Sequence, residues 1–357
     1  MSAPRPHSHW CIDLPTLRPV ADTFTVQGWV AADSPVHALV PADGSLSSVE
    51  WFDRPDLVPP PDGRAWARGF RARLSRTALR ADTLVCRAHG GDQITELTWQ
   101  FRQAVDPARK ARKLDRIQAE LLAPGVHPVR TADYLNFLPP GTPIEEPALT
   151  SGYGYPENIE ALVARHRAGW VLDYGAGNRP EYLDNVVNLE LAPYPSTDVM
   201  SGDMRLPFRD GCFDAIVTLA VLEHVREPWS AARELVRVLK PGGTLIADVP
   251  FLQPVHAYPS HFFNMTAEGL KSLFADTCDI ESSEVPHYGR PIYTLTWFLQ
   301  RYCDGLPPEQ RAKFSQLRVA DLLAHAGEQA KQDYVAQLPK EFNFELASVT
   351  TVVARKR

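Results

Sequence analysis

The chain has 357 residues, more than the roughly 100 to 200 of a typical single domain, so we expect two domains. Its 44% hydrophobic and 22% charged residues exclude a chain that is disordered throughout. With 37 Lys and Arg against 43 Asp and Glu, the net charge of -6 lacks the basic excess of nucleic-acid-binding proteins, and we expect no nucleic-acid partner.

The cysteines and the N-terminal residues bear on the cellular compartment. The cysteines are odd in number and far apart, which fits neither a disulfide framework nor a metal site; they are Cys11, Cys86, Cys212, Cys278 and Cys303. The first ten residues lack the apolar core of a signal peptide. No apolar stretch is close to the length of a membrane span, which is about 18 residues. We therefore expect a cytoplasmic protein without a membrane-spanning segment.

Residues 24–101 consist of short runs with alternating apolar and polar residues, such as 48–52 and 83–88, separated by turn residues. This pattern predicts an antiparallel sandwich of about seven short strands. We assign residues 1–105 to this smaller all-β domain. Its tryptophans Trp29, Trp51 and Trp99 are either core residues or a platform on which a sugar stacks.

Residues 106–148 differ in character from the sandwich. Basic residues such as Lys113 alternate at helical spacing with Leu114 and Ile117, which predicts an amphipathic helix. Its basic face is either solvated or laid on a membrane or nucleic acid. Six prolines between 124 and 147 then indicate an extended linker.

A second domain over 149–357 begins with a buried-strand pattern that ends at Asp173 and breaks into Gly175-x-Gly177. Such a break brings bare backbone close to a ligand at the carboxyl edge of a parallel sheet. Further strand and turn segments follow in order, at 186–190, 206–208, 213–217, 221–224 and 239–247. Strands that alternate with helical segments predict a doubly wound α/β sheet.

Three of these segments carry a family resemblance: Leu-Pro-Phe at 206–208, Phe-Asp-Ala at 213–215 and Leu-Glu-His-Val at 222–225. With the Gly-x-Gly loop, they resemble class I S-adenosylmethionine-dependent methyltransferases of the small-molecule, type 11 branch, from about residue 151 to the end of the chain. The resemblance implies a Rossmann-like seven-stranded sheet and S-adenosyl-L-methionine as the cofactor. The alternation at 344–353 fits the antiparallel terminal hairpin of that fold.

The resemblance also implies cofactor-binding residues. The first acid and the glycines hold the methionine end, the acid that ends the second strand binds both ribose hydroxyls, and a third acid reads the adenine amino group beside a residue lining the ring. In that order these residues are Asp173, Gly175, Gly177, Glu190, Asp203 and Met204. Asp203 is alternatively a turn-forming residue after Gly202.

The chain departs from the family after Gly177. A third glycine is absent, and residues 178–185 leave room for little more than one helical turn before the second strand. The helix N-terminus that usually helps to hold the cofactor's carboxylate is therefore in question. Arg179 either takes its place by pairing with that carboxylate or lies on the surface. The same gap weakens a nicotinamide-dependent alternative, because pyrophosphate binding relies on a full helix at this turn.

Methyl transfer from a sulfonium needs in-line positioning and, for a hydroxyl acceptor, removal of a proton. Candidate bases are His224, His256 and His261, each of which alternatively has a structural role. Because His256 and His261 are five apart in a proline-rich loop, we expect no helix-face metal pair and no metal.

Two segments around this chemistry have proposed roles. Residues 151–156, with two Gly and two Tyr, fit a mobile flap over the cofactor. Residues near 286–340 predict helices that form a substrate cap, in which Trp297 is either a core residue or an acceptor stack.

The leading hypothesis is a methyltransferase, most simply O-directed, for a small-molecule or sugar-like acceptor such as a glycan precursor. The alternative is a non-catalytic glycan- or partner-binding protein with a degenerate methyltransferase-like domain.

Overall fold

The computed structural model describes residues 8–14, 19, 23–44, 48–54, 57, 65–80, 83–90, 93–100, 105–144, 153–202, 205–256, 260–323, 326–353 and 355. It divides into two compact units. One comprises Met1–Thr218 with Arg237–Ile246, and the other comprises Leu219–Val236 with Ala247–Arg357.

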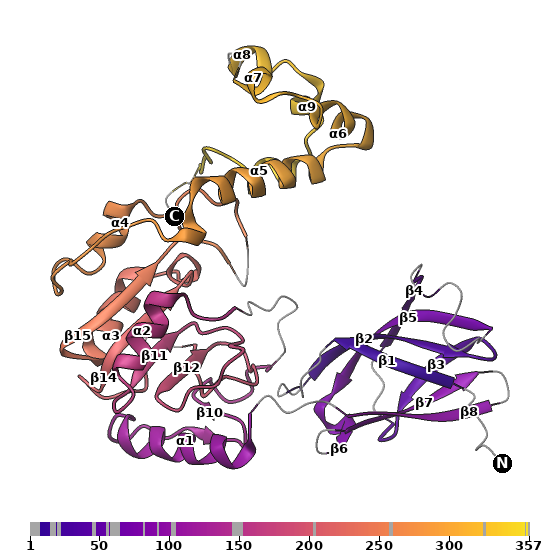
Figure 1. Ribbon diagram of the computed structural model, residues 1–357, viewed down its shortest axis with the longest axis horizontal. Helices are drawn as coiled ribbons and strands as arrows, with labels where there is room; N and C mark the ends of the chain where they lie inside the picture. The colour runs from indigo at the N-terminus through magenta and orange to yellow at the C-terminus, as the bar shows by residue number, and fades with distance from the viewer. Residues whose placement is uncertain are drawn as a thin grey trace. The chain divides into compact units, whose positions relative to one another are not determined.

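The first eight strands of the described chain form two antiparallel sheets (Figure 1). One sheet has the order β1 (Ser8–Leu14), β2 (Thr23–Ala32), β5 (Trp66–Ser75), β4 (Ser48–Phe52). In the other, β7 (Thr83–Gly90) pairs with β3 (Val36–Pro41), with the short β6 (Leu79–Arg80), and with β8 (Gln93–Gln100). The predicted antiparallel sandwich is confirmed.

Alternate residues of both sheets face one shared core. Phe24 of β2, Phe70 of β5 and Leu84 of β7 are almost fully buried in it, and burial of each such side chain contributes about 1.5 to 3 kcal/mol. Trp51 and Trp99 also pack against this core, as expected for structural tryptophans. The sequence patterns missed β1, β3 and the two-residue strand β6.

The predicted Rossmann-like sheet is present and has seven strands. Its order is β15 (Leu239–Asp248), β14 (Phe213–Leu219), β11 (Val171–Tyr174), β12 (Val186–Glu190), β13 (Val199–Met200), β10 (Leu135–Asn136), β9 (Val129–Arg130). The pairs β14–β11, β11–β12, β12–β13 and β13–β10 are parallel, and β10–β9 is antiparallel. The helices α2 (Glu157–Arg165) and α3 (Pro228–Val238) precede β11 and β15 along the chain.

Two expectations about the edges of this sheet are wrong. Residues 129–136, expected within an extended linker, supply β9 and β10, because Tyr134 and Leu135 are apolar residues that the structure buries almost completely. The terminal hairpin expected at 344–353 does not form. Helix α10 (Lys340–Glu345) occupies its start, and residues 347–353 contain neither helix nor strand. The valines of this segment are not buried, since Val352 and Val353 are 88% and 94% exposed.

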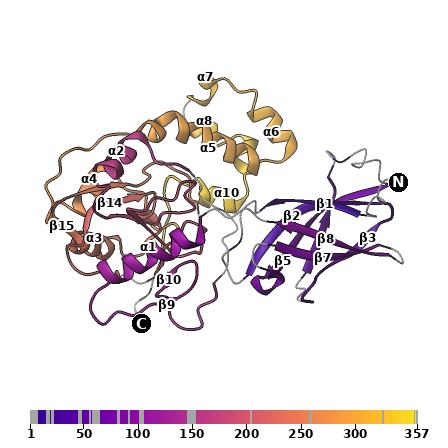
Figure 2. The ribbon, with the colours of Figure 1, turned by 60° about the horizontal axis from the view of Figure 1, so that its bottom comes forward.

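The predicted amphipathic helix is α1 (Pro107–Glu120), which Asp106 caps by accepting a hydrogen bond from the backbone of Arg109 at 2.6 Å. Leu114 and Ile117 are buried, and α1 lies beside β10 in both ribbon views (Figures 1 and 2). Parallel strands are usually joined by a helix, yet residues 175–185 between β11 and β12 contain none. Helix α1 packs on this connection instead, and Arg109 forms an ion pair with Asp184 at 2.7 Å.

The basic face of α1 is not fully solvated. Lys113 Nζ lies 2.6 Å from Asp198 Oδ2, and Lys110 Nζ donates to the carbonyl of Thr197 at 2.6 Å. All three charged side chains are buried, and Tyr182 donates a hydrogen bond to Asp198 Oδ1. Two buried cations therefore share one carboxylate.

The second unit carries the helices expected near 286–340 (Figure 1). They are preceded by α4 (Ala267–Ser272) and consist of α5 (Pro291–Gly305), α6 (Pro308–Phe314), α7 (Val319–Leu322), α8 (Ala326–Gln329) and α9 (Asp333–Ala336), with α10 after them. Leu306, Phe314 and Leu338 form a small core among them. Among the described helices, none is both long and apolar enough to cross a lipid bilayer.

Candidate functional site

The loop after β11 has the conformation that its glycines suggest. Gly175 and Gly177 have φ angles of +73° and +64°, in the left-handed region that glycine adopts without steric cost. The backbone N–H groups of Gly175 and Ala176 both donate to the carbonyl of Leu189 in β12, at 3.0 and 3.1 Å. Hydrogen bonds to the neighbouring strand therefore fix the position of the loop.

Asp173 lies at the end of β11, fully buried, and is paired within the protein. Arg179 Nε donates to its Oδ2 at 2.8 Å, and Nη2 donates to its Oδ1 at 3.2 Å. The hydroxyl of Tyr155 donates to the same carboxylate at 2.5 Å. Arg179 is therefore buried in the loop, and the surface alternative for this residue is wrong.

Arg179 is also held by the segment expected to form a flap. Its Nη1 donates to the carbonyl of Tyr153 at 3.2 Å, and the guanidinium carbon lies 4.4 Å from the ring centroid of Tyr155. Burial alone would lower the pKa of Arg179, but the charge of Asp173 raises it above its usual range. Burial and the same carboxylate raise the pKa of the Tyr155 hydroxyl. Arg179 is therefore a fixed cation at this loop.

Glu190 ends β12, as predicted, and is bound to the Gly-x-Gly loop. Its Oε1 accepts from the backbone N–H of Gly177 at 2.8 Å, and its Oε2 accepts from that of Leu191 at 2.8 Å. Burial raises the pKa of Glu190. The backbone of Ala192 also hydrogen-bonds to this carboxylate, so its oxygens have at most one acceptor position left for a ligand after these three bonds, out of four lone pairs in total.

Two predicted residues, Asp203 and Met204, lie outside the described residues. The nearby acid Asp214 has the structural role that its position at a strand start suggests. It accepts a hydrogen bond from the backbone of Trp170 at 2.9 Å and pairs with Lys240 at 2.7 Å.

The three candidate bases lie together in the second unit. The ring centroids of His224, His256 and His261 are 4.4 to 5.6 Å apart. His224 follows β14 in the short 3-10 turn Leu222–His224, whereas His256 and His261 follow β15. The backbone N–H of Phe262 donates to the carbonyl of Glu223 at 2.7 Å and ties the two segments to each other.

Hydrogen-bond partners assign the tautomers of these rings. His224 Nδ1 lies 2.8 Å from the carbonyl of Ser260, and His256 Nδ1 lies 3.0 Å from that of Pro254. A carbonyl only accepts, so both Nδ1 atoms carry hydrogen and both Nε2 atoms keep a lone pair. Burial lowers the pKa of both rings and favours their neutral form.

His261 is fully engaged within the protein. Its Nδ1 accepts from the backbone N–H of His256 at 3.2 Å, and its Nε2 lies 3.0 Å from Asn264 Oδ1. The Asn264 amide nitrogen donates to the carbonyl of Gln253 at 3.0 Å, which turns its oxygen toward His261. Of the three rings, His261 is therefore suited to hold His256 in place, whereas the other two have an available nitrogen.

Sequence reasoning missed Glu223, which precedes His224 in the Leu-Glu-His-Val segment. Its side chain is fully buried, and within the described chain neither of its carboxylate oxygens has a hydrogen-bond partner. Its Oε1 lies 3.7 Å from His224 Nε2. Burial, with a smaller effect of Asp248, raises the pKa of Glu223 to about 8. The sequence places an acid beside His224, but only the structure shows that this acid is buried without a hydrogen-bond partner.

Two features border the histidine group. Among the described residues other than glycine, Ala220 alone has a positive φ, of 54°, and its backbone N–H donates to Asp248 Oδ1 at 2.8 Å. Trp297 of α5 lies with its ring centroid 5.3 Å from that of His256. The turn after β14 is thus strained, and an aromatic ring of the helical region packs on the group.

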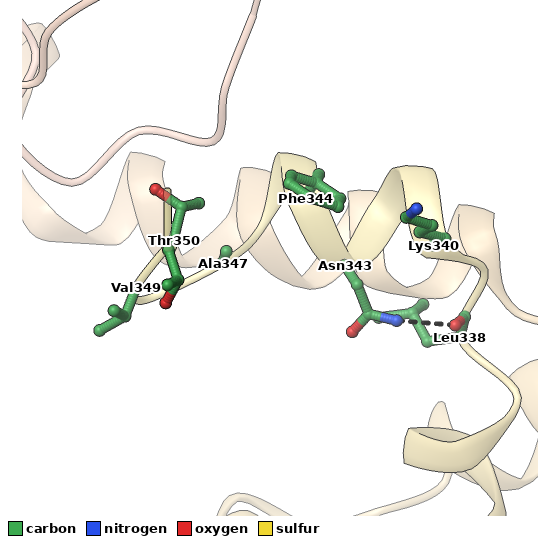
Figure 3. A pocket seen from close by; sticks show the side chains of 8 residues that line it. Leu338, Lys340, Asn343, Phe344, Ala347, Val349 and Thr350 are labelled. Atoms are coloured by element: carbon green, nitrogen blue, oxygen red, sulfur yellow. Dashed lines mark hydrogen bonds between the residues drawn. The ribbon is translucent and has the colours of Figure 1, made fainter. Parts of the chain in front are cut away.

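A separate pocket lies at the end of the described chain (Figure 3). It is lined by residues between Leu338 and Thr351, including Lys340 and Phe344, and Asn343 Nδ2 donates to the carbonyl of Leu338 at 2.8 Å. No predicted site residue lines this pocket.

Comparison with known proteins finds similarity in the segment that contains β11, β12 and β14. Residues 150–247 match a family model described as a methyltransferase domain. A probable S-adenosylmethionine-dependent methyltransferase of Mycolicibacterium smegmatis is 33% identical over 100 residues, which are 28% of this chain and 35% of that protein. A demethylmenaquinone methyltransferase of Renibacterium salmoninarum is 45% identical over 53 residues, 15% of this chain and 22% of the other.

A solved phosphoethanolamine N-methyltransferase of Haemonchus contortus is 11% identical, with a TM-score of 0.28 over 88% of this chain and 66% of its own. The chain spans about a fifth to a third of the length of the curated relatives it matches. The segment 150–247, which contains β11, β12 and the loop between them, is thus similar to methyltransferase domains.

Proposed function

We propose that the protein transfers the methyl group of S-adenosyl-L-methionine to a small-molecule or sugar-like acceptor. The observation that carries the proposal is the Gly-x-Gly loop after β11, hydrogen-bonded to the acid that ends β12 within a segment that matches methyltransferases. The cofactor-binding residues in this proposal are Asp173, Gly175, Gly177, Arg179 and Glu190, with Asp203 and Met204 at the adenine.

The role of Arg179 follows from its remaining donors. A guanidinium has five N–H groups. The described contacts place two of them on Asp173 and one on Tyr153, and the side chain also hydrogen-bonds to Tyr155. In this proposal the remaining donor capacity of Arg179 serves the carboxylate of the cofactor's methionine end. The buried arginine thus takes over the part that a helix N-terminus has elsewhere.

For the reaction, we infer O-methylation with a histidine base. The acceptor hydroxyl gives its proton to Nε2 of His224 or His256, while its oxygen forms a bond to the methyl carbon. The bond between that carbon and the sulfonium sulfur breaks, its electron pair stays on sulfur, and the neutral thioether leaves as S-adenosylhomocysteine. The two available Nε2 lone pairs support this assignment, and His261 acts as a positioning residue.

Calorimetric titration with S-adenosyl-L-methionine tests the cofactor proposal. We expect binding by the full chain and a loss of at least tenfold in affinity in Glu190→Ala, since that acid would no longer accept from the ribose. Exposed Glu328 provides a matched control as Glu328→Ala, which should bind normally. An unmodified chain that does not bind the cofactor would contradict the proposal.

The alternative of a non-catalytic binding protein draws on one observation, the absence of a helix between β11 and β12 in the described chain. An acceptor panel decides between the two functions. Turnover of any hydroxyl-bearing acceptor, detected as S-adenosylhomocysteine, excludes the non-catalytic alternative. The sandwich of residues 1–105 has the role of an accessory domain in this proposal, and the helices near 286–340 that of a cap.

A further inference from the structure

Three side chains from two segments of the second unit converge within the space of a small ion. One ring nitrogen of His224, one of His256 and one carboxylate oxygen of Glu223 lie within 4.8 Å of one another. The spacing of His256 and His261 gave no hint of this group, because Glu223 and His224 come from the turn after β14, more than thirty residues earlier.

The hydrogen bonds of the two rings resemble those of metal-binding histidines. A histidine that ligates a metal usually donates its other ring N–H to a carbonyl or carboxylate, which fixes its tautomer and its orientation. His224 and His256 each direct Nδ1 to a backbone carbonyl, at 2.8 and 3.0 Å. Their Nε2 lone pairs are therefore the atoms available to a cation.

Glu223 provides an independent observation. A buried carboxylate without a partner costs several kcal/mol unless it is neutralised or binds a cation. Its side chain is fully buried, its two oxygens have no hydrogen-bond partner among the described residues, and Oε1 lies 3.7 Å from His224 Nε2. An acid in this setting is an unsatisfied ligand beside two available imidazoles.

We propose that Glu223, His224 and His256 bind one divalent transition-metal cation of the Zn²⁺ type. Imidazole nitrogens favour Zn²⁺ and similar ions, whereas Mg²⁺ and Ca²⁺ favour sites made of oxygen alone. Zinc ligands lie about 2.0 to 2.1 Å from the ion, or about 3.3 Å from one another in a tetrahedron. The ligand atoms, which lie within 4.8 Å of one another, would therefore approach each other by up to about 1.5 Å on binding.

Three protein ligands leave a coordination position open. Where the proposed function holds, an acceptor hydroxyl at that position would lose its proton more readily, because a bound cation lowers the pKa of a coordinated oxygen. The two imidazoles would then act as ligands, and the hydroxyl proton would pass to solvent water instead of to a histidine. This role rests on the proposed function, but binding of the cation does not.

The test uses the untagged full chain, stripped with a chelator and then titrated with Zn²⁺ by calorimetry, in parallel with Mg²⁺. We expect one Zn²⁺ per chain and no competition by Mg²⁺. In Glu223→Gln, His224→Ala and His256→Ala we expect affinity to fall by more than the roughly 10- to 100-fold that loss of an outer-shell partner costs. His127→Ala, at an exposed histidine, should bind as the unmodified chain does.

Glu223→Gln keeps the shape of the side chain, and circular dichroism checks that each variant is folded. Absence of Zn²⁺ binding, binding that survives all three substitutions, or binding of Mg²⁺ in preference to Zn²⁺ would each overturn the proposal. Titration with S-adenosyl-L-methionine on the same samples keeps the two proposals apart. Binding of Zn²⁺ without binding of the cofactor would support the metal site and contradict the proposed function. Binding of the cofactor without binding of Zn²⁺ would support the proposed function and contradict the metal site.

Discussion

Arg179 binds both carboxylate oxygens of Asp173, at 2.8 Å from Nε to Oδ2 and 3.2 Å from Nη2 to Oδ1, and both side chains are buried. The acid that ends β11 is thus neutralised by a residue six positions later in the same loop. The bidentate geometry needs a planar guanidinium, which lysine does not provide.

The first prediction concerns this pair. Arg179→Met would leave Asp173 buried with only the Tyr155 hydroxyl as a partner, and removal of one member of a buried pair costs about 3 to 5 kcal/mol. We expect that loss in the free energy of unfolding, measured with urea, and a smaller loss in Arg179→Lys, which keeps the charge. Equal losses in the two variants would contradict this, because they would show that the charge without the bidentate geometry contributes nothing.

The second prediction concerns the group that anchors α1. Asp198→Asn would leave Lys110 and Lys113 buried without a counter-ion, so we expect the free energy of unfolding to fall by about 3 to 5 kcal/mol. Exposed Asp210 gives a control as Asp210→Asn, for which we expect a change of less than about 1 kcal/mol. Chemical unfolding of both variants measures the difference, and a similar small effect in each would contradict this account of the group.

The third prediction is a pH dependence of stability. Burial lowers the pKa of Lys110 from its usual 10.5 to about 8. Between these values the unfolded chain holds a proton on this lysine that the folded protein does not. The free energy of unfolding therefore rises with pH across this window, and the cost of burying the charge is fully present below about pH 8.

Lys110→Met removes this contribution and isolates it from other groups that titrate in the same range. We expect the rise in stability between pH 8 and 10 to be smaller in this variant than in the unmodified chain. Urea unfolding at several pH values measures both curves, and parallel curves would show that Lys110 does not titrate in this window.

The fourth prediction concerns the strained turn after β14. Ala220 has a φ of 54°, and a left-handed conformation costs a residue with a Cβ about 1 to 2 kcal/mol. Glycine avoids that cost but loses about 0.5 to 1 kcal/mol of chain entropy. We expect Ala220→Gly to raise the free energy of unfolding by about 0.5 to 1 kcal/mol. A lower thermal midpoint in Ala220→Gly than in the unmodified chain would contradict this.

Patterns of apolar residues predicted the strands whose own residues determine which faces are buried. The alternation of β2, β5 and β7 indicated the sandwich because one face of each strand is buried, and the apolar run that ends at Asp173 indicated β11 because it is buried on both faces. The same reasoning failed at 344–353, where the described residues form a helical turn and irregular backbone in place of strands.

The candidate site was predicted in part. The three histidines were identified from their positions after predicted strands, and the structure brings them together. Glu223 was missed because burial and the lack of a partner are properties of the folded chain. Lys110 and Lys113 looked like a solvated face because a sequence does not show that Asp198, 85 residues beyond Lys113, lies beneath them.

The position of α1 has a practical consequence for anyone who shortens this protein. The family match begins at residue 150, and an expression fragment cut there would retain the Gly-x-Gly loop and the three histidines. It would also lose α1 together with β9 and β10, uncover the hydrogen-bonding edge of β13, and leave Asp198 inside without either lysine. The smallest fragment that folds therefore starts before Asp106, some forty residues upstream of the match.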